Sequence, residues 1–236
     1  LMPAKNRNKV FFAKGFYHIY NRGVEKREIF QDDQDYLVFL HFLKKYLSPP
    51  PPANSDPTKI VPLVSMDLHD EIDLLAYCLM PNHFHLLLQQ KMKDSMTKLL
   101  RRVTTAYVLY FNRKNKRVGP LFQGIYKAVA VDNENYLMHL SRYIHLNPIK
   151  IKEVDRDDPP GGPTSTRSDL IGYRWSSYLD YVGERKTEWV KTDLILSYFK
   201  NAKSKDISLR DFNSYQGFVE NSINDPWGII GNLTLD

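Results

Sequence analysis

The chain has 236 residues, of which 42% are hydrophobic and 13% aromatic, with a formal net charge of +6 and a pI near 9.2. This composition supplies enough apolar surface for a sizeable core, so it excludes a disordered chain. No run approaches the about 20 apolar residues of a membrane span, and the single cysteine, Cys78, excludes an internal disulfide, so we expect a folded, soluble protein that stays in the cell.

The first half of the chain contains strand and helix patterns in turn. Alternating aromatic and β-branched residues predict a strand at Phe16–Arg22, and the apolar spacing of Asp32–Leu47 predicts a helix. Ile72–Met80 and His83–Gln90 are two strand-like runs. The turn pair Pro81-Asn82 between them predicts an antiparallel hairpin.

The next elements continue this alternation. Ser95–Asn112 has apolar residues on one face and basic residues on another, which predicts a helix with one packed side. Phe122–Val131 is a strand candidate, and Asn133–Asn147 is a helix that we expect Pro148 to end. The order predicts an α+β fold, a ferredoxin-like antiparallel sheet with helices packed on it.

Two loop-like segments indicate how the chain is divided. A proline-rich loop at 48–62 reads as an insertion inside a main domain that spans residues 10–153. A second loop, Asp155–Thr166, opens an extension over residues 154–236, in which we expect a small helical C-terminal tail.

Positive charge is concentrated in one segment. Between Lys91 and Arg117 the chain has nine lysines and arginines and one acid, Asp94. Such a segment is typical of a polyanion-binding surface, although a solvated helix face has the same composition.

The most specific local pattern is His83-Phe84-His85. Because side chains alternate along a strand, the two imidazoles share one face and Phe84 points to the other. Two neighbouring imidazoles make half of a metal site for zinc, manganese or magnesium, and the spacing does not choose among these metals.

The third predicted helix presents a polar face. His139, Tyr143 and Asn147 follow one another at intervals of four residues, so they line one side of the helix. We expect the tyrosine and the amide to face outward together, while the apolar stripe is formed by Leu137, Leu140 and Ile144.

Several motifs together resemble a known family, the single-tyrosine HUH transposases, and among them the REP-associated tyrosine transposases. The segment Tyr77–Leu87, which contains His83 and His85, is similar to the HUH signature of that family. The remaining motifs occur in the family's order at Tyr17–Gly23, Leu121–Lys127, Tyr143–Pro148 and Tyr173–Tyr178.

The resemblance implies a chemistry for these residues. It implies that His83 and His85 ligate Mg²⁺ or Mn²⁺, that Asn147 is a third metal ligand, and that Tyr143 is the nucleophile. Attack on a phosphodiester would leave a 5′-phosphotyrosine, which retains the bond energy for rejoining the strands.

The resemblance also implies a partner, which is single-stranded or hairpin DNA next to a repeat. It places the protein in the bacterial cytoplasm, associated with the nucleoid, and leaves open whether the chain is a monomer or a homodimer. The cations that we expect to contact DNA are Arg22, Lys98, Arg101, Arg102, Arg113, Lys114, Arg117 and Lys127.

Two other functions are compatible with the same motifs. One is a DNA-binding repressor or domesticated host factor that keeps the fold without turnover. The other is a metal-dependent nuclease in which water attacks instead of tyrosine.

Overall fold

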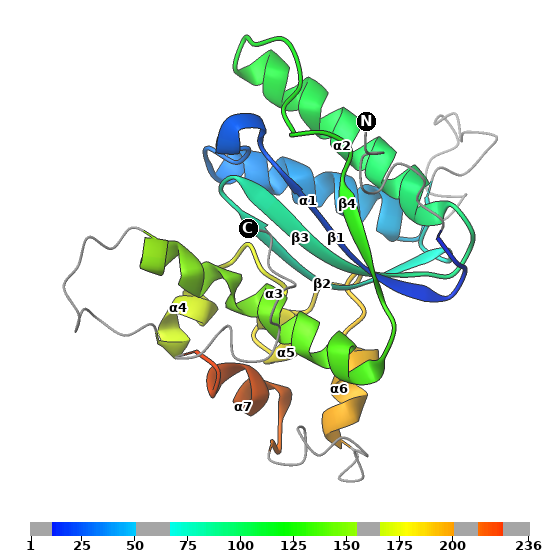
Figure 1. Ribbon diagram of the computed structural model, residues 1–236, viewed down its shortest axis with the longest axis vertical. Helices are drawn as coiled ribbons and strands as arrows, with labels where there is room; N and C mark the ends of the chain where they lie inside the picture. Colours follow the sequence, from blue (N-terminus) through cyan, green and yellow to red (C-terminus); the bar gives the residue numbers. More distant parts are fainter. Residues whose placement is uncertain (1–10, 51–66, 155–165, 201–211, 224–236) are drawn as a thin grey trace, which may run out of the picture.

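The computed structural model describes residues 11–50, 67–154, 166–200 and 212–223. Most of the proline-rich loop predicted at 48–62, and all of the predicted loop 155–166 except Thr166, lie outside these residues. The described chain forms one four-stranded antiparallel sheet in the order β2-β3-β1-β4, with helices on both faces (Figure 1). The predicted α+β fold is therefore confirmed.

The strands are β1 (Gly15–Arg22), β2 (Ile72–Met80), β3 (His83–Gln90) and β4 (Lys127–Val131). The larger helices are α1 (Asp33–Leu47), α2 (Ser95–Lys114) and α3 (Glu134–Val154). The short helices are the 3-10 turn η1 (Val24–Lys26), α4 (Arg167–Gly172), α5 (Tyr178–Tyr181), α6 (Asp193–Lys200) and α7 (Tyr215–Glu220).

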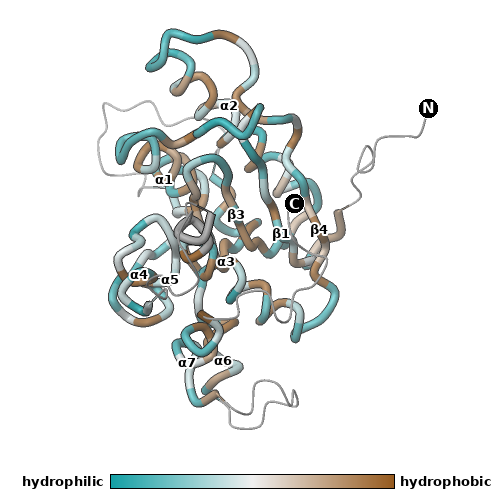
Figure 2. The backbone as a smooth tube through the Cα atoms, turned by 60° about the vertical axis from the view of Figure 1, so that its left-hand side comes forward, coloured by the Kyte–Doolittle hydropathy of each residue, from teal (hydrophilic) through white to brown (hydrophobic). Residues whose placement is uncertain are grey.

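Side-chain alternation divides the core into two layers. On one face of the sheet, Ile19 and Phe84 pack against α1 and α2 around Phe39. On the other face, Cys78 and Leu87 pack against α3 and the C-terminal helices. Figure 2 shows hydrophobic and hydrophilic residues alternating along the helices that surround the sheet, as expected for helices that bury one face.

The C-terminal segments cover the outer edge of the sheet and the far side of α3. Ser176 forms an antiparallel bridge to Cys78, and Val190 forms a parallel bridge to Leu74, so both pair with β2. The backbone N–H of Leu79 donates to the carbonyl of Trp175. These contacts occupy backbone groups of an edge strand that would otherwise be exposed.

The strand predicted at Phe122–Val131 is wrong in its first half, because β4 begins at Lys127. The preceding residues pair with the end of β1 instead. Gln123 N–H donates to the carbonyl of Arg22 at 2.9 Å, and Val24 N–H donates to the carbonyl of Leu121 at 2.9 Å. Residues 121–126 therefore form a loop that these bonds hold against the end of β1, and we call it the pinned loop. It lies beside α2.

The predicted end of the third helix is also wrong, because α3 continues through Pro148 to Val154. Proline lacks an N–H, which removes the normal hydrogen bond to the carbonyl of Ile144. The side-chain Nδ2 of Asn147 lies 3.5 Å from that carbonyl and 2.9 Å from the carbonyl of Tyr143. Asn147 thus supplies a donor where the helix loses one.

Candidate active site

The two histidines of β3 lie on the same face of the sheet, as predicted. The ring centroids of His83 and His85 are 4.9 Å apart, and the rings are nearly perpendicular. Phe84 points into the opposite core layer. His85 is fully buried, whereas His83 is half-buried at the end of the strand.

Strand β1 adds a third imidazole that the sequence analysis did not single out. His18 Nε2 lies 2.9 Å from His85 Nδ1, and the two rings stack with centroids 5.1 Å apart. Burial lowers the pKa of His18 to about 3, so this ring is neutral at physiological pH. The only signal for it in the sequence is its place in the alternation of the first strand motif.

Tyr143 on α3 faces these histidines. Its ring centroid is 5.7 Å from that of His85 and 6.2 Å from that of His18, with an edge-on geometry in both pairs. The backbone positions of α3 and β3 thus bring the phenol and the imidazoles together, which the sequence analysis required and could not test.

The prediction that Tyr143 and Asn147 face outward is wrong, since both are buried, as is His139. Tyr143 faces the sheet, while the C-terminal helix α7 covers the side of α3 that holds His139. The ring of His139 lies 5.4 Å from that of Phe218. The sequence period placed these residues on one side of α3 but did not reveal what packs there.

A second buried cluster joins α3 to the C-terminal segments. His145 Nδ1 lies 2.7 Å from the hydroxyl of Tyr215, and its Nε2 lies 2.7 Å from Ser177 Oγ. The Tyr215 hydroxyl also donates to Ser141 Oγ at 3.1 Å. Burial lowers the pKa of His145 to about 3, so a neutral imidazole joins α3 to the C-terminal segments.

The donor atoms of the β3 histidines suit a metal ion. His83 Nδ1 lies 2.6 Å from the Asn82 side-chain oxygen, so Nδ1 carries the hydrogen and Nε2 carries the lone pair. His85 is held in the same way through its Nδ1 by His18. Hydrogen bonds at the second ring nitrogen orient metal-binding histidines in this manner.

A complete set of protein ligands is not present in the part of the chain that the structure describes. No three His, Cys, Asp or Glu side chains there come close enough together to hold a metal ion. An ion bound by His83 and His85 would therefore need further oxygen ligands from an amide, water or phosphate. The Asn147 amide, predicted as the third ligand, donates here to carbonyls of its own helix.

Two of the predicted DNA-binding cations lie beside the histidines. Arg22 is the register partner of His83 across β1 and β3, and the Lys127 ammonium lies 5.5 Å from the ring centre of Tyr20. Both line a small cleft of about 90 Å³ together with Gln123. The ring of Tyr20 is in turn 6.1 Å from that of His85, so this cleft adjoins the candidate site.

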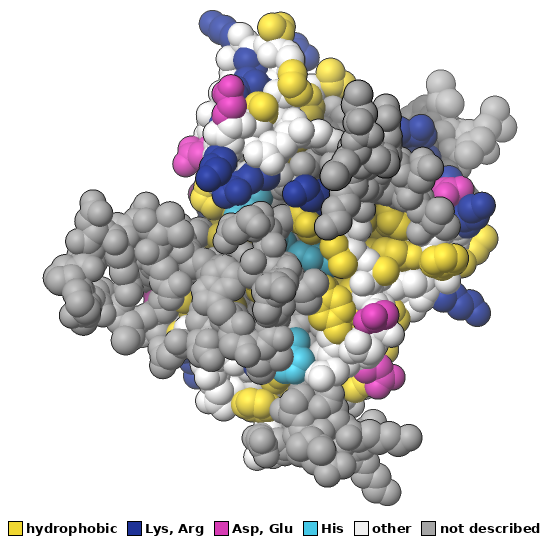
Figure 3. All heavy atoms as spheres, in the orientation of Figure 1, with side chains coloured by type: hydrophobic (Ala, Val, Ile, Leu, Met, Phe, Trp, Pro, Cys, Tyr) yellow, Lys and Arg dark blue, Asp and Glu magenta, His cyan; other side chains and the backbone are white. Residues whose placement is uncertain are grey.

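The other six predicted cations lie on or just after α2 and have different surroundings. Arg101 and Arg113 are exposed, whereas the Lys114 ammonium forms ion pairs of 2.7 Å with Asp32 and 2.6 Å with Asp35. On the face in Figure 3, Lys and Arg side chains gather over the upper part of the molecule, above histidine side chains at its centre. The remaining three predicted cations also contact other side chains. Lys98 lies near Glu71, Arg102 lies near the Tyr46 ring, and Arg117 is hydrogen-bonded to Asn112.

Comparisons with known proteins agree with the motifs. A family model described as "Transposase IS200 like" matches residues 63–147, which is over a third of the chain. A solved structure of a REP-associated tyrosine transposase bound to a REP hairpin matches with a TM-score of 0.52 at 13% identity, covering 86% of this chain and 95% of that chain. No curated protein sequence matches the chain. The resemblance expected from the sequence is confirmed, and the structural match supports the fold.

No helix in residues 11–50, 67–154, 166–200 and 212–223 is both long and apolar enough to cross a membrane.

Proposed function

We propose that this chain, in which residues 63–147 carry the IS200-like transposase domain, cuts and rejoins single-stranded DNA through a covalent bond to Tyr143. The observation that carries the proposal is the edge-on packing of the Tyr143 ring against His85 across the sheet interface, with centroids 5.7 Å apart. This arrangement supports the proposal because it brings the phenol of Tyr143 next to the proposed metal-binding pair.

The reaction that suits these groups is a transesterification. The Tyr143 hydroxyl oxygen attacks the phosphorus of a phosphodiester and loses its proton to solvent, the bond to the 3′-oxygen breaks, and the 5′-phosphate stays on the tyrosine while the 3′-oxygen takes up a proton. The released 3′-hydroxyl can reverse the step on the same or another 5′-phosphotyrosine. One phosphoester bond is exchanged for another, so rejoining the strands needs no nucleoside triphosphate.

Each residue of the site has a separate task in this proposal. His83 and His85 would hold Mg²⁺ or Mn²⁺, which when bound neutralises charge on the phosphate and activates the phenol. His18 orients His85 through the hydrogen bond to its Nδ1. Arg22 and Lys127 contact the backbone phosphates next to the scissile one, because both line the adjoining cleft.

The substrate is proposed to be a hairpin or repeat with an unpaired strand beside it. The related transposase of known structure is bound to a REP hairpin, which supports this class of partner. Tyr143 and the histidines meet within one chain, so the proposed site does not require a second subunit. A homodimer would thus serve a different purpose, such as holding two DNA ends.

The decisive experiment looks for the covalent intermediate. A single-stranded hairpin labelled at its 3′ end, the end that stays on the protein after cleavage, is copied from an inverted repeat that flanks the gene, incubated with the protein and Mn²⁺ and run on a denaturing protein gel. The wild-type chain and a Tyr136→Phe control, which changes another tyrosine of α3, should carry label. A Tyr143→Phe variant should carry none.

The other outcomes identify the alternative functions. Cleaved DNA with free ends and no labelled protein would indicate water as the nucleophile. Binding of the hairpin without cleavage in Mn²⁺ would favour a DNA-binding protein that does not turn over. Label on the Tyr143→Phe variant would reject Tyr143 as the nucleophile.

A further inference from the structure

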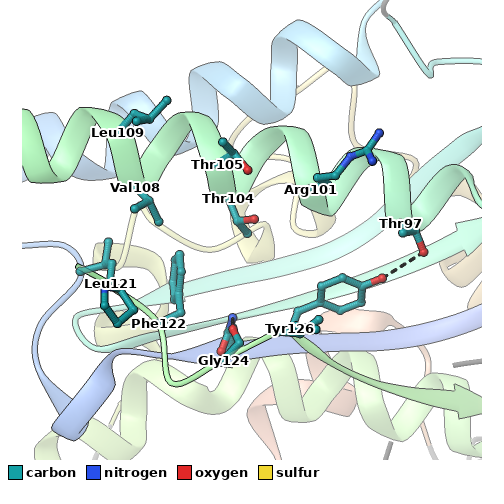
Figure 4. A pocket seen from close by; sticks show the side chains of 13 residues that line it. Thr97, Arg101, Thr104, Thr105, Val108, Leu109, Leu121, Phe122, Gly124 and Tyr126 are labelled. Atoms are coloured by element: carbon teal, nitrogen blue, oxygen red, sulfur yellow. Dashed lines mark hydrogen bonds between the residues drawn. The ribbon is translucent and has the colours of Figure 1, made fainter. Parts of the chain in front are cut away.

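A groove of about 670 Å³ runs between α2 and the pinned loop that precedes β4 (Figure 4). It lies on the side of that loop away from Tyr143. We call it the α2 groove and define it by its lining residues, which are Asn21, Thr97, Arg101, Thr104, Thr105, Val108, Leu109, Pro120, Leu121, Phe122, Gly124, Ile125 and Tyr126.

The walls of the α2 groove are apolar, with polar groups at a few points. Large hydrophobic side chains are exposed on both sides, with Leu109 67% exposed on α2 and Ile125 80% exposed on the loop. The aromatic rings of Phe122 and Tyr126 form the floor (Figure 4). The hydroxyl of Tyr126 lies 3.2 Å from Thr97 Oγ1, which places hydroxyl groups at one end.

The groove is built before any ligand arrives. Asn21 Nδ2 donates to the carbonyl of Gly124 at 3.1 Å, and the N–H of Gln123 donates to the carbonyl of Arg22. These bonds fix the loop wall to the end of β1. A preformed site avoids part of the ordering cost of binding, so exposed apolar side chains held in this way are available for a ligand.

The α2 groove shares a wall with the small cleft that adjoins the candidate active site. Asn21, Gly124 and Ile125 line both the groove and the small cleft that contains Arg22 and Lys127. The same cleft includes Tyr20, whose ring is 6.1 Å from that of His85. A single strand that passes Tyr143 can thus continue over these cations to the mouth of the groove.

We propose that the α2 groove binds an unpaired nucleobase of the strand whose phosphate lies at Tyr143. This inference rests on the proposed function and adds to it a subsite for a base at some distance from the cut. Phe122, Ile125 and Tyr126 provide apolar and aromatic contact, and the hydroxyl groups at the Thr97 end can bond to the edge of the base.

A nucleobase fits these walls better than the other parts of DNA. The groove volume falls within the roughly 300–1,000 Å³ that is typical of small-ligand sites. A space of this size can hold a base but not a DNA duplex. Phosphates need cations, and among the lining residues Arg101 is the only charged one. Arg101, together with Arg22 and Lys127 in the adjoining cleft, instead suits the backbone that carries the base.

The test compares two probes that have the same phosphates. One is a short oligothymidylate and the other is an abasic deoxyribose-phosphate oligomer of equal length. The ratio of their affinities for the full chain measures base contact, because phosphate contacts cancel. Ile125→Asp replaces an apolar contact to the base by a charge, which predicts that the ratio falls by about 5-fold or more.

Val118→Asp is the matched control, because Val118 is an exposed β-branched residue, 93% exposed, that does not line the groove. It introduces the same charge a few residues away and should leave the ratio unchanged. The proposal would be overturned if the affinity ratio were unchanged in Ile125→Asp, or if it fell equally in both variants. The groove would then be a candidate site for a protein partner instead.

The labelled-protein assay for Tyr143 is run in parallel on the wild-type chain. Covalent labelling with no effect of Ile125→Asp would reject the base subsite alone. A base-dependent ratio that falls in Ile125→Asp without covalent labelling would reject the cleavage chemistry and retain the subsite.

Discussion

The hydroxyl of Tyr215 lies 2.7 Å from Nδ1 of His145, inside the core, and joins the C-terminal helix α7 to the helix that carries Tyr143. The other nitrogen of His145 meets Ser177 Oγ at 2.7 Å. An imidazole bonded at both nitrogens fixes the rotation of α3 about its own axis. The C-terminal segments therefore help to aim Tyr143 at the sheet.

Removal of the Tyr215 hydroxyl should destabilise the fold. In Tyr215→Phe the buried His145 Nδ1 loses its partner, which costs about 1–3 kcal/mol of unfolding free energy. Urea denaturation followed by circular dichroism measures this loss. Tyr198→Phe on α6 is the control, because Tyr198 is only half-buried and its hydroxyl bonds to the exposed Glu134, so its loss should change stability by less than about 0.5 kcal/mol. Equal effects in the two variants would contradict a structural role for the His145 contact.

Local patterns were enough to predict the sheet around the candidate site. The strands Ile72–Met80 and His83–Gln90 have the predicted bounds, because their alternation and the Pro81-Asn82 turn are encoded within a few residues. The shared face of His83 and His85 follows from the same alternation.

Features that depend on distant parts of the chain were not predicted. His18 meets His85 diagonally across β1 and β3, since His18 pairs with Leu87 and His85 pairs with Tyr20, and a single strand motif does not reveal this contact. Tyr143 and His139 are buried because α3 is enclosed by the sheet on one side and by α7 on the other, and the sequence period gives no information on either partner. Arg22 and Lys127 lie beside the site, but only the fold distinguishes them from the cations on α2.

The continuation of α3 past Pro148 should depend on Asn147. Asn147→Ala removes the side-chain donor to the carbonyls of Tyr143 and Ile144, and we expect a loss of about 1 kcal/mol in stability without any metal present. Pro148→Ala in the same background restores a backbone N–H and should recover most of the loss. Thermal unfolding of the two variants measures both effects. If Pro148→Ala does not recover the lost stability, Asn147 does not stabilise α3 by replacing the missing N–H of Pro148.

His18 is expected to act through His85 and not to contact DNA. His18→Phe removes the hydrogen bond to His85 Nδ1, and loss of such an orienting partner lowers metal affinity by about 10–100-fold. Calorimetric titration with Mn²⁺ gives the affinity, and binding of oligothymidylate in a chelator should be unchanged. His41→Phe on the exposed side of α1 is the matched control. Unaltered Mn²⁺ affinity in His18→Phe would remove His18 from the site.

Lys114 and Arg113 are neighbours on α2 and should give opposite results. Lys114 pairs with Asp35, whose side chain is fully buried, so Lys114→Ala leaves a buried carboxylate without its cation. Tyr110 and the Gln31 N–H still bond to that carboxylate, which limits the expected loss of stability to about 1–3 kcal/mol.

Arg113 is exposed, so Arg113→Ala should leave stability within about 0.5 kcal/mol and lower the salt dependence of DNA binding by about one phosphate contact. Urea denaturation and salt titration of oligothymidylate binding measure the two effects. A loss of DNA affinity in Lys114→Ala at unchanged stability would return Lys114 to the DNA-binding surface.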